Sequence, residues 1–129
     1  MTRLPKYDVV SIEDLSLDEI ERIFELADEF AAALEQRKPL DLASGLIMAT
    51  LFYEPSTRTR LSFESAMHRL GGAVISSAEM KASSAIKGES LADTVRVVSA
   101  YADLIVVRHP NDGAARVRPG ADSPWQGQP

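Results

Sequence analysis

Apolar residues recur along the first part of the chain with the period of a helix. Between Ser16 and Gln36 they fall every three or four positions, which predicts one amphipathic helix over this span. Ser16 with Glu19 three positions later is the capping-box pattern found at helix starts. The predicted apolar face consists of Ile20, Ile23, Phe24, Ala27, Ala31 and Leu34. The opposite face is charged and is expected to be solvated (Glu21, Arg22, Glu25, Asp28, Glu29 and Glu35).

Three short apolar runs further along predict β-strands. They cover residues 46–52, 73–76 and 103–107. The first run is bounded by Gly45 and Pro55, and its length suits a buried strand. After Asp103 the third run is unbroken by polar residues, a pattern typical of a parallel sheet that is buried on both faces.

Helical patterns separate these strands. A helix is predicted over about 57–70, ending at the pair Gly71-Gly72, and another over about 91–101 with Ser90 as its N-cap. Residues 77–89 show no sustained period and are predicted to be a loop. Strands that alternate with helices predict an α/β fold, here a three-layer doubly wound parallel sheet. In such sheets ligands bind at the carboxyl ends of the strands.

Composition narrows the class of protein. The chain has 129 residues, of which 45% are hydrophobic, so one domain with a substantial core is expected. A formal charge of −5 argues against general nucleic-acid binding. The absence of cysteine excludes disulfides and thiolate metal sites and fits a reducing compartment. No apolar stretch is long enough for a membrane span, so a cytoplasmic protein without a membrane partner is expected.

The turn between the first strand and the following helix carries the candidate chemistry. It places the hydroxyls of Ser56 and Thr57 and the guanidiniums of Arg58 and Arg60 at a helix start. Unpartnered N–H groups and the positive end of the helix dipole lie there as well. Two arginines would be unfavourable at that end without an anion, and phosphate is the anion that fits best. The segment 108–110 (Arg-His-Pro) follows the third strand and is expected at the same edge of the sheet.

Simpler interpretations remain for these residues. Ser56 or Thr57 could be an ordinary N-cap, with Arg58 and Arg60 solvated on the surface. The repeated Thr-Arg pair directly after a strand favours the anion site instead. The two histidines, His68 and His109, are interpreted as structural or surface residues, and Met48, Met67 and Met80 as core residues.

Three motifs, in order along the chain, resemble the carbamoyltransferase family. The segment 52–64 (Phe-Tyr-Glu-Pro-Ser-Thr-Arg-Thr-Arg-Leu-Ser-Phe-Glu) is similar to that family's carbamoyl-phosphate signature. The segments 83–90 (Ser-Ser-Ala-Ile-Lys-Gly-Glu-Ser) and 108–110 resemble the aspartate carbamoyltransferase branch. The ornithine branch generally lacks the lysine that stands here as Lys87, which counts against an ornithine-type enzyme. The resemblance covers residues 5–117.

The resemblance implies transfer of a carbamoyl group from carbamoyl phosphate to the amine of L-aspartate, a step of pyrimidine synthesis. Carbamoyl phosphate would be bound by Ser56, Thr57, Arg58, Thr59 and Arg108. Of these, Arg58 would neutralise the leaving phosphate. Arg108 with Thr59 would stabilise charge that develops on the carbonyl oxygen.

The resemblance also assigns residues outside this cradle. Ser83 and Lys87 would enter the active site of a neighbouring subunit in a homotrimer, with Lys87 among the catalytic residues. Glu54 would organise the site by pairing with positive charge on mobile loops. No metal and no organic cofactor are expected, because carbamoyl phosphate is already activated.

The sequence departs from the family after residue 117. The carbamoyl-phosphate-binding domain, predicted over 1–117, is therefore expected to be incomplete. Residues 118–129 are expected to be a disordered tail, and the amino-acid-binding domain is expected to be absent. A chain without that domain is expected to show no meaningful turnover alone. The alternative from another functional class is a non-catalytic anion-binding module that assembles with full-length chains.

Overall fold

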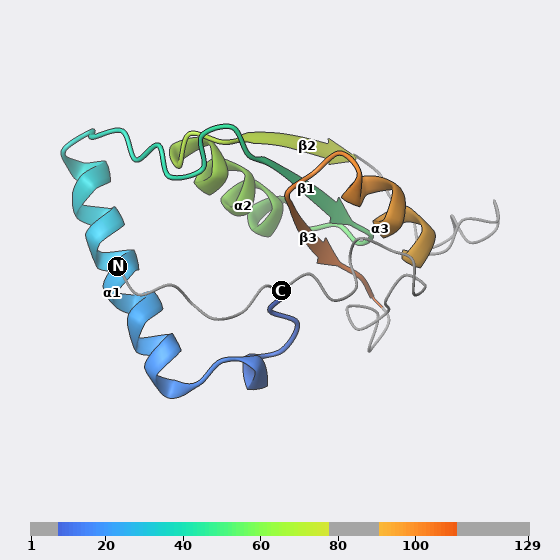
Figure 1. Cartoon of the computed structure of the whole chain (residues 1–129), viewed down its shortest axis with the longest axis horizontal. Helices are drawn as coiled ribbons and strands as arrows, with labels where there is room; N and C mark the ends of the chain where they lie inside the picture. The colour runs from blue at the N-terminus through green and yellow to red at the C-terminus, as the bar shows by residue number, and fades with distance from the viewer. Residues whose placement is uncertain (1–7, 78–90, 111–129) are drawn as a thin grey trace. The chain divides into compact units, whose positions relative to one another are not determined.

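The computed structural model describes residues 8–77 and 91–110 of the chain (Figure 1). They belong to two compact units, one ending at Leu40 and the other beginning at Asp41. The elements are η1 (Ile12–Asp14), α1 (Leu17–Glu35), β1 (Ile47–Phe52), α2 (Thr57–Arg69), β2 (Ala73–Ser77), α3 (Leu91–Ser99) and β3 (Leu104–Arg108). The predictions for Met80, Ser83, Lys87, Ser90 and the tail 118–129 lie outside the described residues.

The first unit contains the predicted helix, and its capping box is confirmed. Ser16 Oγ accepts a hydrogen bond of 3.2 Å from the Glu19 N–H, and Glu19 Oε1 accepts one of 3.0 Å from the Ser16 N–H. The short helix η1, which was not predicted, begins with the same reciprocal pattern between Ser11 and Asp14. Both starts follow from local chemistry, because a side chain three residues away satisfies an otherwise unpaired donor.

The two faces of α1 are both largely accessible. No residue of α1 is buried, and Phe24 on the predicted apolar face is exposed. On the charged face, Arg22 pairs with Glu25 at 3.0 Å and approaches Glu29 at 3.9 Å, so this face is linked by ion pairs as well as solvated. Pairs as exposed as these contribute only about 0–1 kcal/mol each. Among the described residues, no helix is long and apolar enough to cross a membrane.

The second unit is built on the predicted parallel sheet, with strand order β2-β1-β3. Met48 of β1 stands opposite Val74 of β2 and Leu104 of β3. At the start of the ladder, Asp103 Oδ2 accepts a hydrogen bond of 2.9 Å from the Ile47 N–H, and Ile47 O accepts one of 2.8 Å from the Asp103 N–H. This pair of bonds fixes the start of the β1–β3 register.

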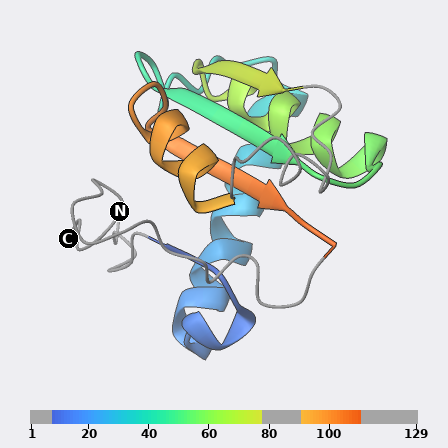
Figure 2. The ribbon, with the colours of Figure 1, turned by 90° about the vertical axis from the view of Figure 1, so that its right-hand side faces the viewer.

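Helices cover both faces of the sheet, so the three-layer, doubly wound prediction is confirmed (Figure 2). Alternate residues of β1 point to opposite faces. Met48 packs with Met67 of α2 in one core cluster, while Leu51 packs with Val95 of α3 in the other. The interpretation of Met48 and Met67 as core residues is confirmed.

The burial predicted for the third strand is wrong. Residues 103–107 were expected to be buried on both faces, but Leu104 is 47% exposed and no residue of β3 is fully buried. The central strand β1 has that property instead, with five of its six residues buried. The physical reason is position: β3 lies at one side of the described sheet, and an apolar run alone does not reveal whether a strand is central.

Candidate anion-binding site

The register of the sheet brings two distant segments together. Phe52 at the end of β1 stands opposite Arg108 at the end of β3, and the Tyr53 N–H donates to Arg108 O at 2.8 Å. The strands are parallel, so both chains leave the sheet at the same edge. The strand-to-helix turn therefore lies beside Arg108, as the sequence predicted.

Arg108 forms the centre of the site. Its Nε donates to Glu54 Oε1 at 2.6 Å, and its Nη1 donates to Ser56 Oγ at 2.8 Å and to Thr59 Oγ1 at 3.2 Å. The charge-assisted bond to Glu54 fixes the plane of the guanidinium. Both side chains remain partly accessible to solvent. Four predicted site residues (Glu54, Ser56, Thr59 and Arg108) are thus in one hydrogen-bonded group.

The start of α2 has no side-chain cap. Ser56 occupies the N-cap position, but its hydroxyl makes no capping hydrogen bond and accepts from Arg108 instead. The first helical bond runs from the Arg60 N–H to Ser56 O at 3.0 Å. The amides of the three preceding residues have no acceptor within the helix, as at any helix start. Ser56 is therefore the N-cap residue by position only, and no side chain of residues 8–77 and 91–110 caps these amides.

The two arginines of the turn have different surroundings. Arg58 is exposed and has no ion pair with any side chain of the described residues. Arg60 has a partner within its own helix, because its Nε lies 3.4 Å from Glu64 Oε1. From the sequence, both charges were expected to need an anion at the helix start. The i,i+4 spacing of Arg60 and Glu64 was the signal that could have separated them.

The remaining described candidates are Thr57 and the two histidines. The ring centroids of His109 and Tyr53 lie 4.9 Å apart with the ring planes tilted by 50°, which agrees with a structural role for His109. His68 is exposed in the last turn of α2. Thr57 is the first residue of α2 and is exposed. Within residues 8–77 and 91–110, no three His, Asp or Glu side chains gather as a metal site would require.

The arrangement suits a small oxyanion. Arg108 is held by two hydroxyls and a carboxylate, and Arg58 has no ion pair within the described part of the chain. The first amides of α2 have no side-chain cap among the described residues. Helix dipole and cationic side chains act in the same direction at this point. Charge neutralisation and multiple N–H and O–H donors are what a phosphate group requires.

Comparison with known proteins agrees with this chemistry. Residues 7–124 match the family model described as aspartate/ornithine carbamoyltransferase, carbamoyl-P binding domain. The aspartate carbamoyltransferase catalytic subunit of Thermoplasma acidophilum is 57% identical over 114 residues, covering 88% of this chain and 37% of the relative. That of Picrophilus torridus is 60% identical over 114 residues, covering 88% and 38%.

Solved structures of aspartate transcarbamoylases are also similar to this chain. The catalytic subunit of M. jannaschii aspartate transcarbamoylase superimposes with a TM-score of 0.76 at 57% identity, over 82% of this chain and 35% of that one. Aspartate transcarbamoylase from Trypanosoma cruzi in complex with carbamoyl phosphate and aspartate gives a TM-score of 0.75 at 41% identity, over 84% and 35%.

The chain spans little more than a third of the length of the relatives it matches. The part of the chain that matches the family model, residues 7–124, includes the strand-to-helix turn and the end of β3. On the family match over residues 7–124, this chain belongs to the aspartate/ornithine carbamoyltransferase family, in its carbamoyl-phosphate-binding domain.

Proposed function

We propose that the chain forms the carbamoyl-phosphate half of an aspartate carbamoyltransferase active site. The reaction would join the aspartate amine nitrogen to the carbonyl carbon of carbamoyl phosphate and break the bond from that carbon to the phosphate oxygen. Phosphate leaves with the bonding electron pair, the nitrogen loses a proton, and N-carbamoyl-L-aspartate is formed for pyrimidine synthesis. The aspartate names of the relatives and solved structures favour aspartate over ornithine as acceptor.

One observation carries the proposal: Arg108 joins the end of β3 to the uncapped start of α2 through Ser56 and Thr59. In the proposed complex, Ser56, Thr57, Arg58 and Thr59 bind the phosphate group. Arg108, together with Thr59, stabilises negative charge on the carbonyl oxygen. Fixed donors of this kind lower the barrier because they need no reorganisation during the reaction.

Glu54 takes a defined part in this proposal. The resemblance implied that it pairs with mobile loops, and in the structure it holds Arg108 at 2.6 Å. A carboxylate in that position orients the guanidinium and also reduces its net charge. Glu54 is therefore proposed to orient Arg108 before substrate binds.

Other parts of the proposal rest on the family alone. Ser83 and Lys87 are proposed to act in the active site of a neighbouring subunit of a homotrimer. A cytoplasmic location and the lack of turnover by the chain alone stay predictions. A coupled assay of the purified chain for carbamoyl aspartate checks the latter, and family-like turnover would contradict it.

The proposal is tested by calorimetric titration with phosphonoacetamide, a stable analogue of carbamoyl phosphate. Arg58→Ala is expected to weaken binding about tenfold or more, or roughly 1.4 kcal/mol, because an exposed cation beside the uncapped amides is removed. Arg69→Ala is the matched control, since Arg69 lies in the last turn of the same helix. Equal affinities of the chain and of Arg58→Ala would contradict the assigned site.

A further inference from the structure

A buried hydroxyl in the central strand is not explained by the anion site. Thr50 is fully buried, with 0% exposure, in the otherwise apolar strand β1. It lies on the face of β1 that carries Met48, toward α2. Valine has the same shape and no polar atom to desolvate, so a buried threonine at this position needs hydrogen bonds to offset its cost.

The hydroxyl of Thr50 links three elements. Thr50 Oγ1 donates to Glu64 Oε1 on α2 at 2.9 Å and lies 3.0 Å from Ser76 Oγ on β2. A hydroxyl has one proton, and the carboxylate is the stronger acceptor, so the Ser76 hydroxyl is left to donate to Thr50. Arg60 approaches the same Glu64 oxygen at 3.4 Å. The result is a polar chain, Ser76–Thr50–Glu64–Arg60, that crosses from β2 through β1 to the first turn of α2.

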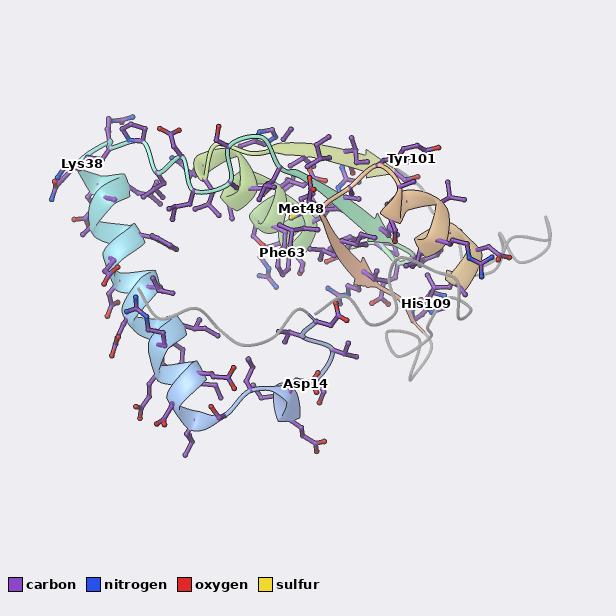
Figure 3. The ribbon with its side chains drawn as sticks, in the orientation of Figure 1. Asp14, Lys38, Met48, Phe63, Tyr101 and His109 are labelled. Atoms are coloured by element: carbon purple, nitrogen blue, oxygen red, sulfur yellow. The ribbon has the colours of Figure 1, made fainter. Side chains whose placement is uncertain are left out.

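The amino-terminal half of α2 has little apolar attachment of its own. Met67, near the other end, is the one buried residue of α2. Leu61 and Phe63, in the half that bears the anion site, are 51% and 45% exposed, and Figure 3 labels Phe63 on this helix. Within the described residues, the side-chain hydrogen bonds that tie the first two turns of α2 and its N-cap to the sheet are the Thr50–Glu64 bond and the bonds of Arg108 to Ser56 and Thr59.

We propose that Thr50 and Glu64 are positioning residues for the anion site, an inference that rests on the function proposed above. The Thr50–Glu64 bond fixes the rotation of α2 about its axis relative to β1. Glu64 also holds the Arg60 side chain beside the helix. Both effects keep the uncapped amides and Arg58 oriented toward the proposed anion. Hydrogen bonding to a carboxylate is stronger and more directional than apolar packing, which suits an orienting contact.

Two measurements on the full chain test this inference. Thr50→Val keeps the shape and removes the hydroxyl, and Thr50→Ser keeps the hydroxyl. We expect Thr50→Val to weaken binding of inorganic phosphate about tenfold, and Thr50→Ser to restore most of it. We also expect Thr50→Val to accelerate amide hydrogen exchange at residues 60–63 more than at residues 67–70. Glu64→Gln is also expected to change the rate of amide hydrogen exchange at residues 60–63.

The exchange pattern separates positioning from general stability. Ser65→Ala is the matched control, because within the described part of the chain the Ser65 hydroxyl donates to Ser62 O of its own helix, at 3.1 Å, and has no bond to the sheet. It is expected to leave phosphate affinity and the exchange pattern unchanged. Unchanged exchange at residues 60–63 in Thr50→Val, or an equal acceleration along all of α2, would overturn the inference. Failure of the unmodified chain to bind phosphate would instead contradict the proposed function, while the exchange pattern would still decide this inference.

Discussion

Arg108→Ala is expected to weaken binding of phosphonoacetamide about 100-fold, or roughly 2.7 kcal/mol. The substitution removes the guanidinium that bonds both Ser56 and Thr59. It also leaves the Glu54 carboxylate without the cation that lies 2.6 Å from it, so a negative charge then faces the incoming anion. Loss of a charged partner costs more than loss of a neutral one because the group left behind is also uncompensated. Calorimetric titration measures the effect directly.

Three further variants identify the cause. Glu54→Gln in the Arg108→Ala background is expected to recover part of the loss, since it removes the repelling charge. The affinity of Arg108→Lys is expected to lie between that of the unmodified chain and that of Arg108→Ala. Lysine keeps the charge but cannot donate from a rigid fork to three partners. Arg96→Ala, on α3 and half exposed, is the control and is expected to bind normally. An affinity of Arg108→Ala within a factor of two or so of the unmodified chain would contradict the role given to Arg108.

Met67→Ala is expected to have the largest effect on folding, a loss of about 2–5 kcal/mol in the free energy of unfolding. Met67 is 3% exposed and packs in one cluster with Ala43 and Met48. Its removal leaves a cavity between α2 and the sheet that the surrounding backbone can fill only in part. Urea unfolding of the second unit, followed by circular dichroism, measures the loss.

A substitution at Gly72 tests the packing of Met67 by adding an atom next to it. A Cβ at Gly72 would overlap the Met67 Cε methyl, lie 3.0 Å from Met67 Sδ and 3.2 Å from Ala43 O. Gly72→Ala alone is therefore expected to cost about 1–3 kcal/mol through overpacking. In the Met67→Ala background the added methyl has room, so the same change is expected to cost less. Additive losses in this double-mutant cycle would contradict the assigned contact.

Local patterns in the sequence were sufficient for the helices and strands from α1 onward, while the short helix η1 was missed. The capping box at Ser16 depends on residues three positions apart, and its geometry is confirmed. The limits of β1 and α2 agree with the predicted spans 46–52 and 57–70 within one residue at each end. Helix α3 ends at Ser99, two residues before the predicted end. Such features are predictable because their hydrogen bonds and periodicity involve neighbours along the chain.

The anion site was predictable in part. The turn between Ser56 and Arg60 was recognisable from residue types at a strand-to-helix junction. Arg108 was expected at the same edge, because parallel strands end together. The partners of Arg108 were not predictable, since they depend on the pairing of Phe52 with Arg108 across the sheet. The same is true of Arg60, whose pairing with Glu64 depends on the side-chain conformations within α2.

By itself, then, the sequence determined the succession of strands and longer helices along the chain, the parallel α/β class and the residue types of an oxyanion site. Tertiary structure decided which strand is central, that the Ser56 hydroxyl serves Arg108 and not its own helix, and that Thr50 bonds to Glu64. The physical reason is the separation of the partners along the chain. Thr50 and Glu64 are 14 residues apart, and Ser56 and Arg108 are 52 apart. Only strand register and helix packing bring such pairs within hydrogen-bonding distance.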